Sequence, residues 1–311
     1  GYADYYLEDL YLSILDVQLL LDIHLIYRDG RYDLSTSEHF SADLQQLDEQ
    51  GYFNYLHGVV LGDATTGEIL YSCKADQAVP IASTTKLMTY MVVRRLMEMG
   101  KFQADDIVTI SADASWLSSA DDGVVYMYEG EQTTVEELIA AMLITSSNEA
   151  ALALAEYAAG SEAAFVELMN AMAFRLGMES AVFYNPHGLP VFLPGDVPAM
   201  VENQVSAEDM FRLARAILLK YPEIEEITSR KELWLDYLWT SVYTTNSLMK
   251  NMPDVFGLKT GTTDAAGKCL VAARRVQIDG ETHVIVSVVL GAEFNRDRVE
   301  ISELLLKSSW Y

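Results

Sequence analysis

Strand-like sequence lies at both ends of the main part of this chain, and helix-like sequence fills the region between them. Residues 58–71 form a predicted hairpin with its turn at 64–67, and strand character returns over residues 258–290 around a turn at Asp279 and Gly280. Such a pattern predicts an antiparallel sheet closed by distant segments, with a helical lobe in the middle. The cleft between two such lobes is a common place for a site.

Capping signals divide the middle region into helices. Thr134 and Glu137 have the spacing of a capping box, and Ser161 and Ser206 each precede a helix-periodic run. Glycines at 100, 160 and 177 mark helix ends. The predicted helices cover about residues 83–100, 134–145, 149–159, 162–176, 206–220 and 295–307.

Residues 1–57 differ from the rest of the chain and carry no recognisable chemistry. Polar and apolar residues alternate over 16–28 with the period of a half-buried strand, and 31–34 can return as a second strand, although a helix over 9–20 competes with this interpretation. We expect a packing or partner-docking appendage. The predicted divisions are an appendage at 1–57 and a main domain at 58–311, with a sheet lobe at about 58–82 and 256–311 and a helical lobe at about 100–245.

Composition excludes several classes of function. The 46 acidic and 21 basic residues give a net charge of −25 without a basic patch, so the chain would repel nucleic acid and anionic membranes. Two cysteines, Cys73 and Cys269, are too few for a zinc site, and one bridge between them stays open. The apolar stretch 10–27 is broken by Asp16 and Asp22, so it is neither a signal peptide nor a membrane span. We expect no metal and no cofactor.

A serine and a lysine, Ser83 and Lys86, are three residues apart at the opening of an apolar helical run. A serine hydroxyl needs a neighbouring base to act as a nucleophile, and a lysine whose pKa is depressed can supply one. The spacing alone is weak evidence, because a chain of this length contains about one such pair by chance, and a second copy occurs at Ser247 and Lys250. An N-capping serine with a surface lysine is the competing interpretation.

Two further motifs follow in a fixed order, Ser146-x-Asn148 and Lys259-Thr260-Gly261. With Ser83-x-x-Lys86 they form the motif set of the penicillin-recognising serine acyl-transferases. From about residue 58 to 311 the chain resembles the D-alanyl-D-alanine carboxypeptidases, the low-molecular-mass penicillin-binding proteins. The matching stretches are residues 82–89, 165–170, 176–178, 185–189, 257–263 and 266–271. The resemblance implies an α+β, β-lactamase/transpeptidase-like fold, with an antiparallel five-stranded sheet flanked by helices and an inserted, mainly helical lobe.

The resemblance also implies a role for each motif residue. Ser83 attacks the carbonyl between two terminal D-alanines and forms an acyl-enzyme. Lys86 takes the serine proton, and the charge of nearby Lys259 is a reason for the pKa of Lys86 to fall. Ser146 relays a proton to the leaving amine, and Asn148 holds a substrate amide.

The remaining implied roles concern the oxyanion and the substrate carboxylate. The backbone N–H groups of Ser83 and Thr262, next to Gly261, form the oxyanion hole. Arg298, with help from Thr260, binds the terminal carboxylate and so restricts cleavage to chain ends. Two positions depart from the family pattern: Ser147 stands where glycine is usual, and Glu149 where aspartate is usual.

Some tempting residues have a structural interpretation that we prefer. His187 belongs to a turn in the resemblance, and Glu167 with Asn170 fits a helix-packing stretch better than a deacylating pair. The methionines of the first helix, such as Met88 and Met91, are expected in the core.

The predicted function is a serine D-Ala-D-Ala carboxypeptidase that trims peptidoglycan stem pentapeptides and is inhibited covalently by β-lactams. The alternatives are a DD-endopeptidase or a β-lactamase with the same nucleophile, or a catalytically silent cell-wall-binding protein. The expected partners are stem peptides ending in D-Ala-D-Ala and β-lactams, with no nucleic acid and with a possible protein partner for residues 1–57. We expect an extracytoplasmic location after export by a signal peptide absent from this chain, and the sequence gives no support for a membrane anchor.

Overall fold

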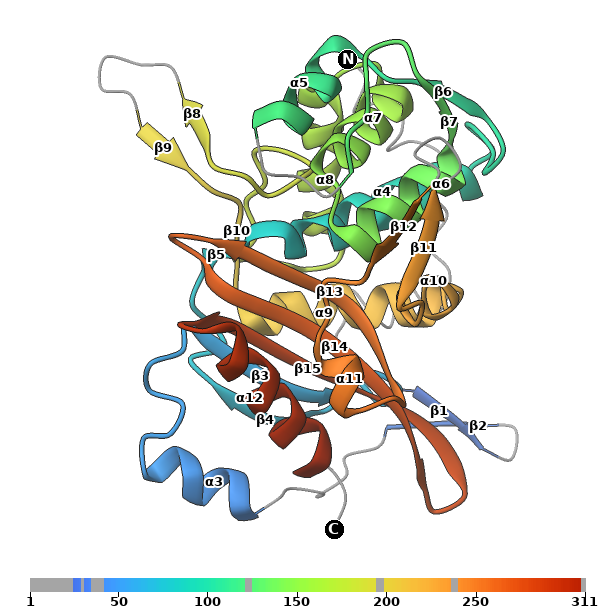
Figure 1. Ribbon diagram of the computed structural model, residues 1–311. Coiled ribbons are helices and arrows are strands. Elements are labelled where there is room, and N and C mark those ends of the chain that lie inside the picture. Colours follow the sequence, from blue (N-terminus) through green and yellow to red (C-terminus); the bar gives the residue numbers. More distant parts are fainter. Residues whose placement is uncertain are drawn as a thin grey trace.

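A five-stranded antiparallel sheet forms the base of the molecule and a helical lobe lies above it (Figure 1). The computed structural model describes residues 25–28, 31–34, 42–120, 125–193, 199–235 and 240–308. The strand order is β13-β14-β15-β3-β4, so β15 from the end of the chain pairs with β3 from its beginning. The strands are β3 (Gly58–Asp63), β4 (Ile69–Cys73), β13 (Val255–Thr263), β14 (Gly267–Ile278) and β15 (Glu281–Ala292). The predicted hairpins and the closure of the sheet by distant segments are confirmed.

Alternation along the strands gives the sheet two apolar faces. On β3, Val59 and Leu61 pack in one buried cluster with Leu305, whereas Val60 packs in another with Phe211. The first cluster lies between one face of the sheet and the helices α12 (Asn295–Ser308), α11 (Leu248–Asn251) and α3 (Ala42–Glu49). The second lies between the other face and α9 (Ala207–Lys220). Each fully buried side chain of this kind contributes about 1.5–3 kcal/mol of transfer free energy.

The helices of the upper lobe begin and end at the predicted signals. Thr134 and Glu137 form the capping box at α6, Ser161 caps α8, and Ser206 caps α9. The helical elements are η1 (Ala82–Thr85), α4 (Lys86–Glu98), α5 (Ala112–Ala120), α6 (Val135–Ala140), η2 (Ala141–Thr145), α7 (Asn148–Ala159), α8 (Glu162–Arg175) and α10 (Ile224–Thr228). The short strands are β5 (Val79–Pro80), β6 (Ile107–Thr109), β7 (Gln132–Thr134), β8 (Val191–Leu193), β9 (Ala199–Val201), β10 (Gln204–Val205), β11 (Glu232–Leu235) and β12 (Thr240–Tyr243).

The first part of the chain contains a small hairpin and a helix that joins the core. β1 (Leu25–Arg28) pairs antiparallel with β2 (Arg31–Leu34), as predicted for the return at 31–34. The predicted strand at 16–24 and the competing helix over 9–20 lie outside the described residues. Leu44, Phe53 and Leu56 are buried in the same cluster as the sheet. The boundary at 57 and a docking role for residues 1–57 stay predictions.

A search for membrane-spanning helices, limited to the part of the chain that the structure describes, found none of sufficient length and apolarity.

Candidate active site

Ser83 lies in a strained turn, and two glycines allow the neighbouring backbone segments to pack closely against it. Ala82 has a φ of +48°, a left-handed conformation that costs an alanine about 1–2 kcal/mol. A Cβ on Gly188 would lie 2.1 Å from the carbonyl oxygen of Ala82, and one on Gly261 would lie 3.0 Å from the backbone nitrogen of Ser83. The turn is therefore packed tightly between the backbone of β13 and the 185–189 segment, and no residue larger than glycine fits at position 188 or 261.

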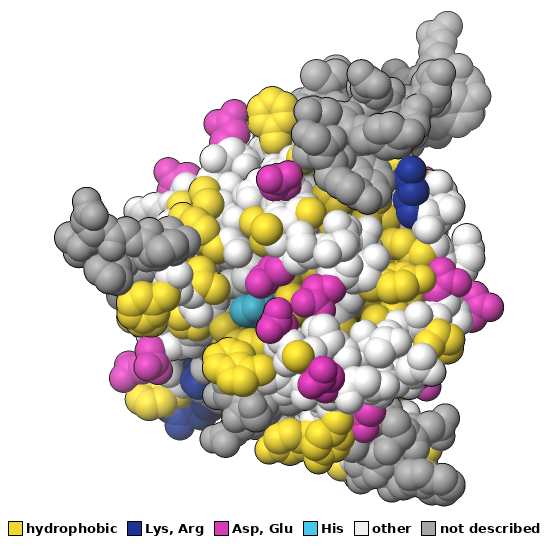
Figure 2. All heavy atoms as spheres, turned by 90° about the horizontal axis from the view of Figure 1, so that it is seen from above, with side chains coloured by type: hydrophobic (Ala, Val, Ile, Leu, Met, Phe, Trp, Pro, Cys, Tyr) yellow, Lys and Arg dark blue, Asp and Glu magenta, His cyan; other side chains and the backbone are white. Residues whose placement is uncertain are grey.

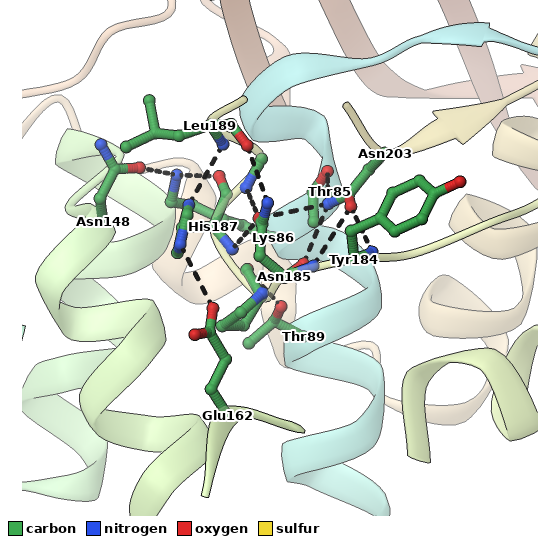
Figure 3. Close-up of polar contacts among 12 residues, drawn as sticks. Thr85, Lys86, Thr89, Asn148, Glu162, Tyr184, Asn185, His187, Leu189 and Asn203 are labelled. Atoms are coloured by element: carbon green, nitrogen blue, oxygen red, sulfur yellow. Dashed lines mark hydrogen bonds and ion pairs between the residues drawn. The ribbon is translucent and has the colours of Figure 1, made fainter. Parts of the chain in front are cut away.

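Lys86 is fully buried at the start of α4 and contacts the Ser83 hydroxyl directly. Its Nζ lies 2.9 Å from Ser83 Oγ, 2.7 Å from Asn148 Oδ1 and 2.7 Å from the carbonyl oxygen of His187. Figure 3 shows Lys86 between Asn148 and the 185–189 segment. Nζ donates to all three oxygens, and once deprotonated the amine can keep its bonds to the two amide oxygens and turn its lone pair to the serine hydroxyl. This geometry suits a lysine that acts as a base.

Ser146 and Asn148 are placed by an irregular end of the preceding helix. After α6 the chain forms a π-helical turn at Ala141–Thr145, and Ser146 then adopts a left-handed φ of +69°. Ser147 caps α7 by accepting a hydrogen bond of 2.9 Å from the Ala150 N–H. The serine that replaces the usual glycine therefore stabilises the helix that carries Asn148. The sequence predicted where the helix ends but not its π-helical turn.

Lys259 is almost completely buried on β13, behind the cavity that Ser83 lines. Its Nζ donates a hydrogen bond of 3.0 Å to the Thr260 carbonyl. Burial, then the charge of Lys86 and then that of Arg298 hold the pKa of Lys259 well below its ordinary range. A lysine with a depressed pKa thus lies close to Lys86 and to the cavity that Ser83 lines.

Arg298 reaches the same strand from α12 and is only 7% exposed. Its Nη1 donates to the carbonyl oxygens of Gly261 at 2.9 Å and Cys269 at 3.1 Å, and it lies 3.4 Å from Thr262 Oγ1. Burial lowers the pKa of Arg298 from its ordinary value. Because these three partners are uncharged, the guanidinium keeps an attraction for an anion in the cavity.

A cavity of about 400 Å³ brings most of the predicted site residues together. Its walls include Ser83, Ser146, Asn148, Thr260, Gly261, Thr262 and Arg298. Lys86 and Lys259 are buried behind it. The decoy Ser247 is not among the lining residues, as predicted, and lies at the start of α11.

Four described residues of this cavity were not singled out from the sequence: Val125, Thr145, Leu189 and Thr245. The hydroxyl of Thr245 lies 2.5 Å from that of Thr260, so it positions a group predicted to meet the substrate. Thr245 belongs to no recognised motif and gives no signal of its own. Leu189 ends a stretch that the family resemblance did identify.

His187 has the structural role that the resemblance implied, and its backbone also contributes to the site. Its Nδ1 accepts a hydrogen bond of 3.1 Å from the Leu189 N–H, and its Nε2 lies 3.5 Å from a Glu162 oxygen (Figure 3). The side chain of Asn185 closes the turn by accepting from the N–H groups of His187 and Gly188. The turn therefore presents the His187 carbonyl to Lys86, while the imidazole lies toward Glu162.

The contacts of Glu167 and Asn170, and of the two cysteines, show what these residues do in the fold. Asn170 bonds to the backbone of Phe183 in both directions at 2.9 Å, and Glu167 is exposed on α8. Both fit the helix-packing interpretation. Cys73 and Cys269 are free thiols. Among the described residues no group of three or more His, Cys, Asp or Glu side chains could hold a metal ion.

Comparisons with known proteins agree on one family. Residues 57–294 match the peptidase family described as D-alanyl-D-alanine carboxypeptidase. The chain is 35% identical to the D-alanyl-D-alanine carboxypeptidase DacC of Escherichia coli over 251 residues, which cover 79% of this chain and 59% of that protein. It thus spans about 60% of the length of the curated relatives it matches.

Solved structures show the same fold. Penicillin-binding protein 6B of Escherichia coli is 32% identical with a TM-score of 0.71, over 82% of this chain and 77% of that one. Penicillin-binding protein D2 of Listeria monocytogenes, solved in an ampicillin-bound form, is 28% identical with a TM-score of 0.69, over 83% of this chain and 98% of that one. The predicted β-lactamase/transpeptidase-like architecture is therefore confirmed.

Proposed function

Because this chain belongs to the D-alanyl-D-alanine carboxypeptidase family of serine peptidases, we propose that it removes the terminal D-alanine from peptidoglycan stem peptides. The observation that carries the proposal is the contact of 2.9 Å between the buried Lys86 amine and the Ser83 hydroxyl. The amine has both of its other hydrogen-bonding directions occupied by oxygens of Asn148 and His187.

Acylation begins when Ser83 Oγ attacks the carbonyl between the two D-alanines. Lys86 takes the hydroxyl proton as the C–O bond forms, and the carbonyl oxygen becomes an oxyanion. The backbone N–H groups of Ser83 and Thr262 would stabilise this charge. The close approach of Gly261 to the Ser83 nitrogen supports this, because a side chain at Gly261 would push β13 away from the turn.

Collapse of the tetrahedral intermediate breaks the peptide bond and expels D-alanine. The leaving amine needs one proton, and Ser146 lines the cavity where it could pass the proton on from Lys86. Asn148 is fixed by its bond to Lys86, so it is positioned to hold the substrate backbone as well. Water then attacks the acyl-enzyme, releases the shortened peptide and restores the Ser83 hydroxyl.

Recognition of a free chain end follows from the cation at the cavity wall. Arg298 would pair with the terminal carboxylate of the substrate, and the linked hydroxyls of Thr260 and Thr245 would donate to it. A substrate without that carboxylate would leave the buried guanidinium without an anionic partner. This favours an exopeptidase over an enzyme that cuts within a chain.

We further propose that β-lactams acylate Ser83, as the ampicillin-bound form of the Listeria monocytogenes relative suggests by analogy. Glu167 is exposed and does not line the cavity, so it offers no carboxylate for rapid deacylation. The proposed substrate is a cell-wall peptide, and we therefore place the protein outside the cytoplasm.

The test is release of free D-alanine from a peptide that ends in D-Ala-D-Ala, together with intact-protein mass after treatment with penicillin. We expect release, and a long-lived adduct of one penicillin that maps to Ser83. If neither D-alanine release nor a penicillin adduct were observed, the proposal would be overturned. Rapid loss of the adduct with turnover of penicillin would instead identify a β-lactamase.

A further inference from the structure

A second, larger cavity opens beside the catalytic one in the helical lobe. It encloses about 1100 Å³ between α5, α7, the start of α8 and the segment after His187. Its walls carry the carboxylates Asp113, Glu156 and Glu162 and the aromatic rings of Trp116 and Tyr157. None of the described residues that line it is a lysine or an arginine. Figure 2 shows the helical lobe from above, with acidic and apolar side chains gathered around a histidine.

The two cavities adjoin each other at the 187–189 segment. Leu189 lines both of them. The carbonyl of His187 binds Lys86 at 2.7 Å, whereas its imidazole lines the larger cavity and lies 3.5 Å from Glu162. One residue therefore separates the catalytic lysine from the acidic cavity. In a substrate acylated at Ser83 the preceding residue lies roughly 3.5 Å further along the backbone, and a long side chain on it can extend past the shared Leu189 toward the larger cavity.

We propose that this cavity binds the side-chain ammonium of the diamino residue that precedes D-Ala-D-Ala in a stem peptide. The inference rests on the proposed function. Three carboxylates, with one histidine but no lysine or arginine among the described lining residues, attract a cation, and the cavity walls shield the pair in part from solvent. Trp116 adds an aromatic face for an ammonium group.

The same charges determine which diamino residue fits. A lysine side chain brings one positive charge, and so does a diaminopimelate whose distal carboxylate is amidated. A free distal carboxylate would bring a negative charge to Asp113 and Glu156, where like charges repel. The cavity therefore favours lysine-type or amidated stems over stems with a free distal carboxylate.

The attraction can be measured with two peptides that differ by one charge. Nα-acetyl-Lys-D-Ala-D-Ala keeps its ε-ammonium, and Nα,Nε-diacetyl-Lys-D-Ala-D-Ala lacks it. We expect kcat/KM for D-alanine release to be about three- to tenfold higher for the free ammonium, since pairs of partly exposed charges contribute up to about 1 kcal/mol each. The ratio should shrink with added salt.

Substitutions of the cavity carboxylates test whether the cavity causes the difference in kcat/KM between the two peptides. Glu156→Gln keeps an oxygen for its bond of 2.6 Å from Ser111, and combined with Asp113→Asn it should bring the ratio of the two peptides close to one. Glu167→Gln removes an exposed carboxylate of α8 outside the cavity and should leave the ratio unchanged. Equal cleavage of both peptides, or a ratio that survives the double substitution, overturns this inference alone. No release from either peptide overturns the proposed function and this inference with it.

Discussion

The chain contains the same serine–lysine spacing twice, and the two copies have opposite surroundings. Ser83 lies in a clamped turn and Lys86 is completely buried, with its amine on the serine hydroxyl. Ser247 begins the short α11, where its hydroxyl accepts a bond of 3.4 Å from Asn295, and Lys250 is exposed.

The difference shows what the spacing does and does not determine. Three residues of helix place two side chains on one face in both copies. Only in the first copy is the lysine fully buried, with oxygens of Asn148 and His187 as acceptors for its N–H groups. An exposed lysine keeps its charge and its hydration, so it cannot take a proton from a serine. Chemistry at such a pair thus depends on the segments that cover it.

Replacing the two serines should give the largest contrast. We expect Ser83→Ala to abolish penicillin labelling and to lower D-alanine release by about a millionfold, as loss of a nucleophile does elsewhere. Ser247→Ala should leave both activities within about twofold of the unchanged chain. Labelling counted by intact-protein mass measures the first, and a D-alanine assay the second. A Ser83→Ala chain that still forms an adduct would contradict the assignment.

Replacing the two lysines should give the next largest contrast. Lys86→Met removes the base but keeps an apolar side chain of similar length, so acylation should slow by about 10²–10⁴-fold. Lys250→Met should acylate at the original rate. Stopped-flow labelling with a fluorescent penicillin gives the rates, and circular dichroism checks that both variants fold. If both lysine variants were equally fast, Lys86 would not be the base.

Two glycines of β13 test how far the clamp around Ser83 matters. A Cβ at Gly261 would contact the Ser83 nitrogen, so Gly261→Ala should slow acylation by about a hundredfold through misplacement of the oxyanion donors. A Cβ at Gly257 would contact the side chain of Asn246, beside the second serine–lysine copy. Gly257→Ala should therefore lower stability more than it lowers the acylation rate. Rates and thermal midpoints of the two variants decide between these outcomes.

The smallest effect concerns stability and compares a buried lysine with the exposed Lys250. The folded protein holds the pKa of Lys259 well below the 10.5 of an ordinary lysine. Between these two values the unfolded chain binds a proton that the folded chain does not, so the free energy of unfolding rises with pH.

The corresponding variant is Lys259→Met, which should lack this rise of about 1.4 kcal/mol per pH unit. Lys250→Met should retain it, because its lysine is exposed. Urea unfolding at several alkaline pH values measures both slopes. Parallel curves for the unchanged chain and Lys259→Met would show that Lys259 titrates normally.

Features with local signals were predictable from the sequence. The hairpins have apolar runs beside turn residues, and the caps at Thr134, Ser161 and Ser206 satisfy helix N–H groups within three residues. The five-stranded topology came from the family resemblance and not from local patterns.

Features that depend on tertiary contact were not predictable. The His187 carbonyl that binds Lys86 is a backbone group, which every residue has. Thr245 acts through a neighbour on another segment, and the π-helical turn before Ser146 has no distinctive sequence. Leu44 and Phe53 are buried beside the sheet, and no local pattern within residues 1–57 predicts that contact.

Pairing between β3 and β15 has a consequence for how the protein folds. Val60 pairs with Val288, so most of the chain, from residue 60 to residue 288, must be closed into a loop before the sheet is continuous. Contacts so distant in sequence slow folding, and the helical lobe can gain structure from local contacts much earlier. Arg298 lies on α12, which follows β15, so the end of the site that we propose to bind a carboxylate forms only after these last segments are in place. A chain that lacks its final segments would carry Ser83 and Lys86 without a complete site, so the proposed acylation would report the completion of folding.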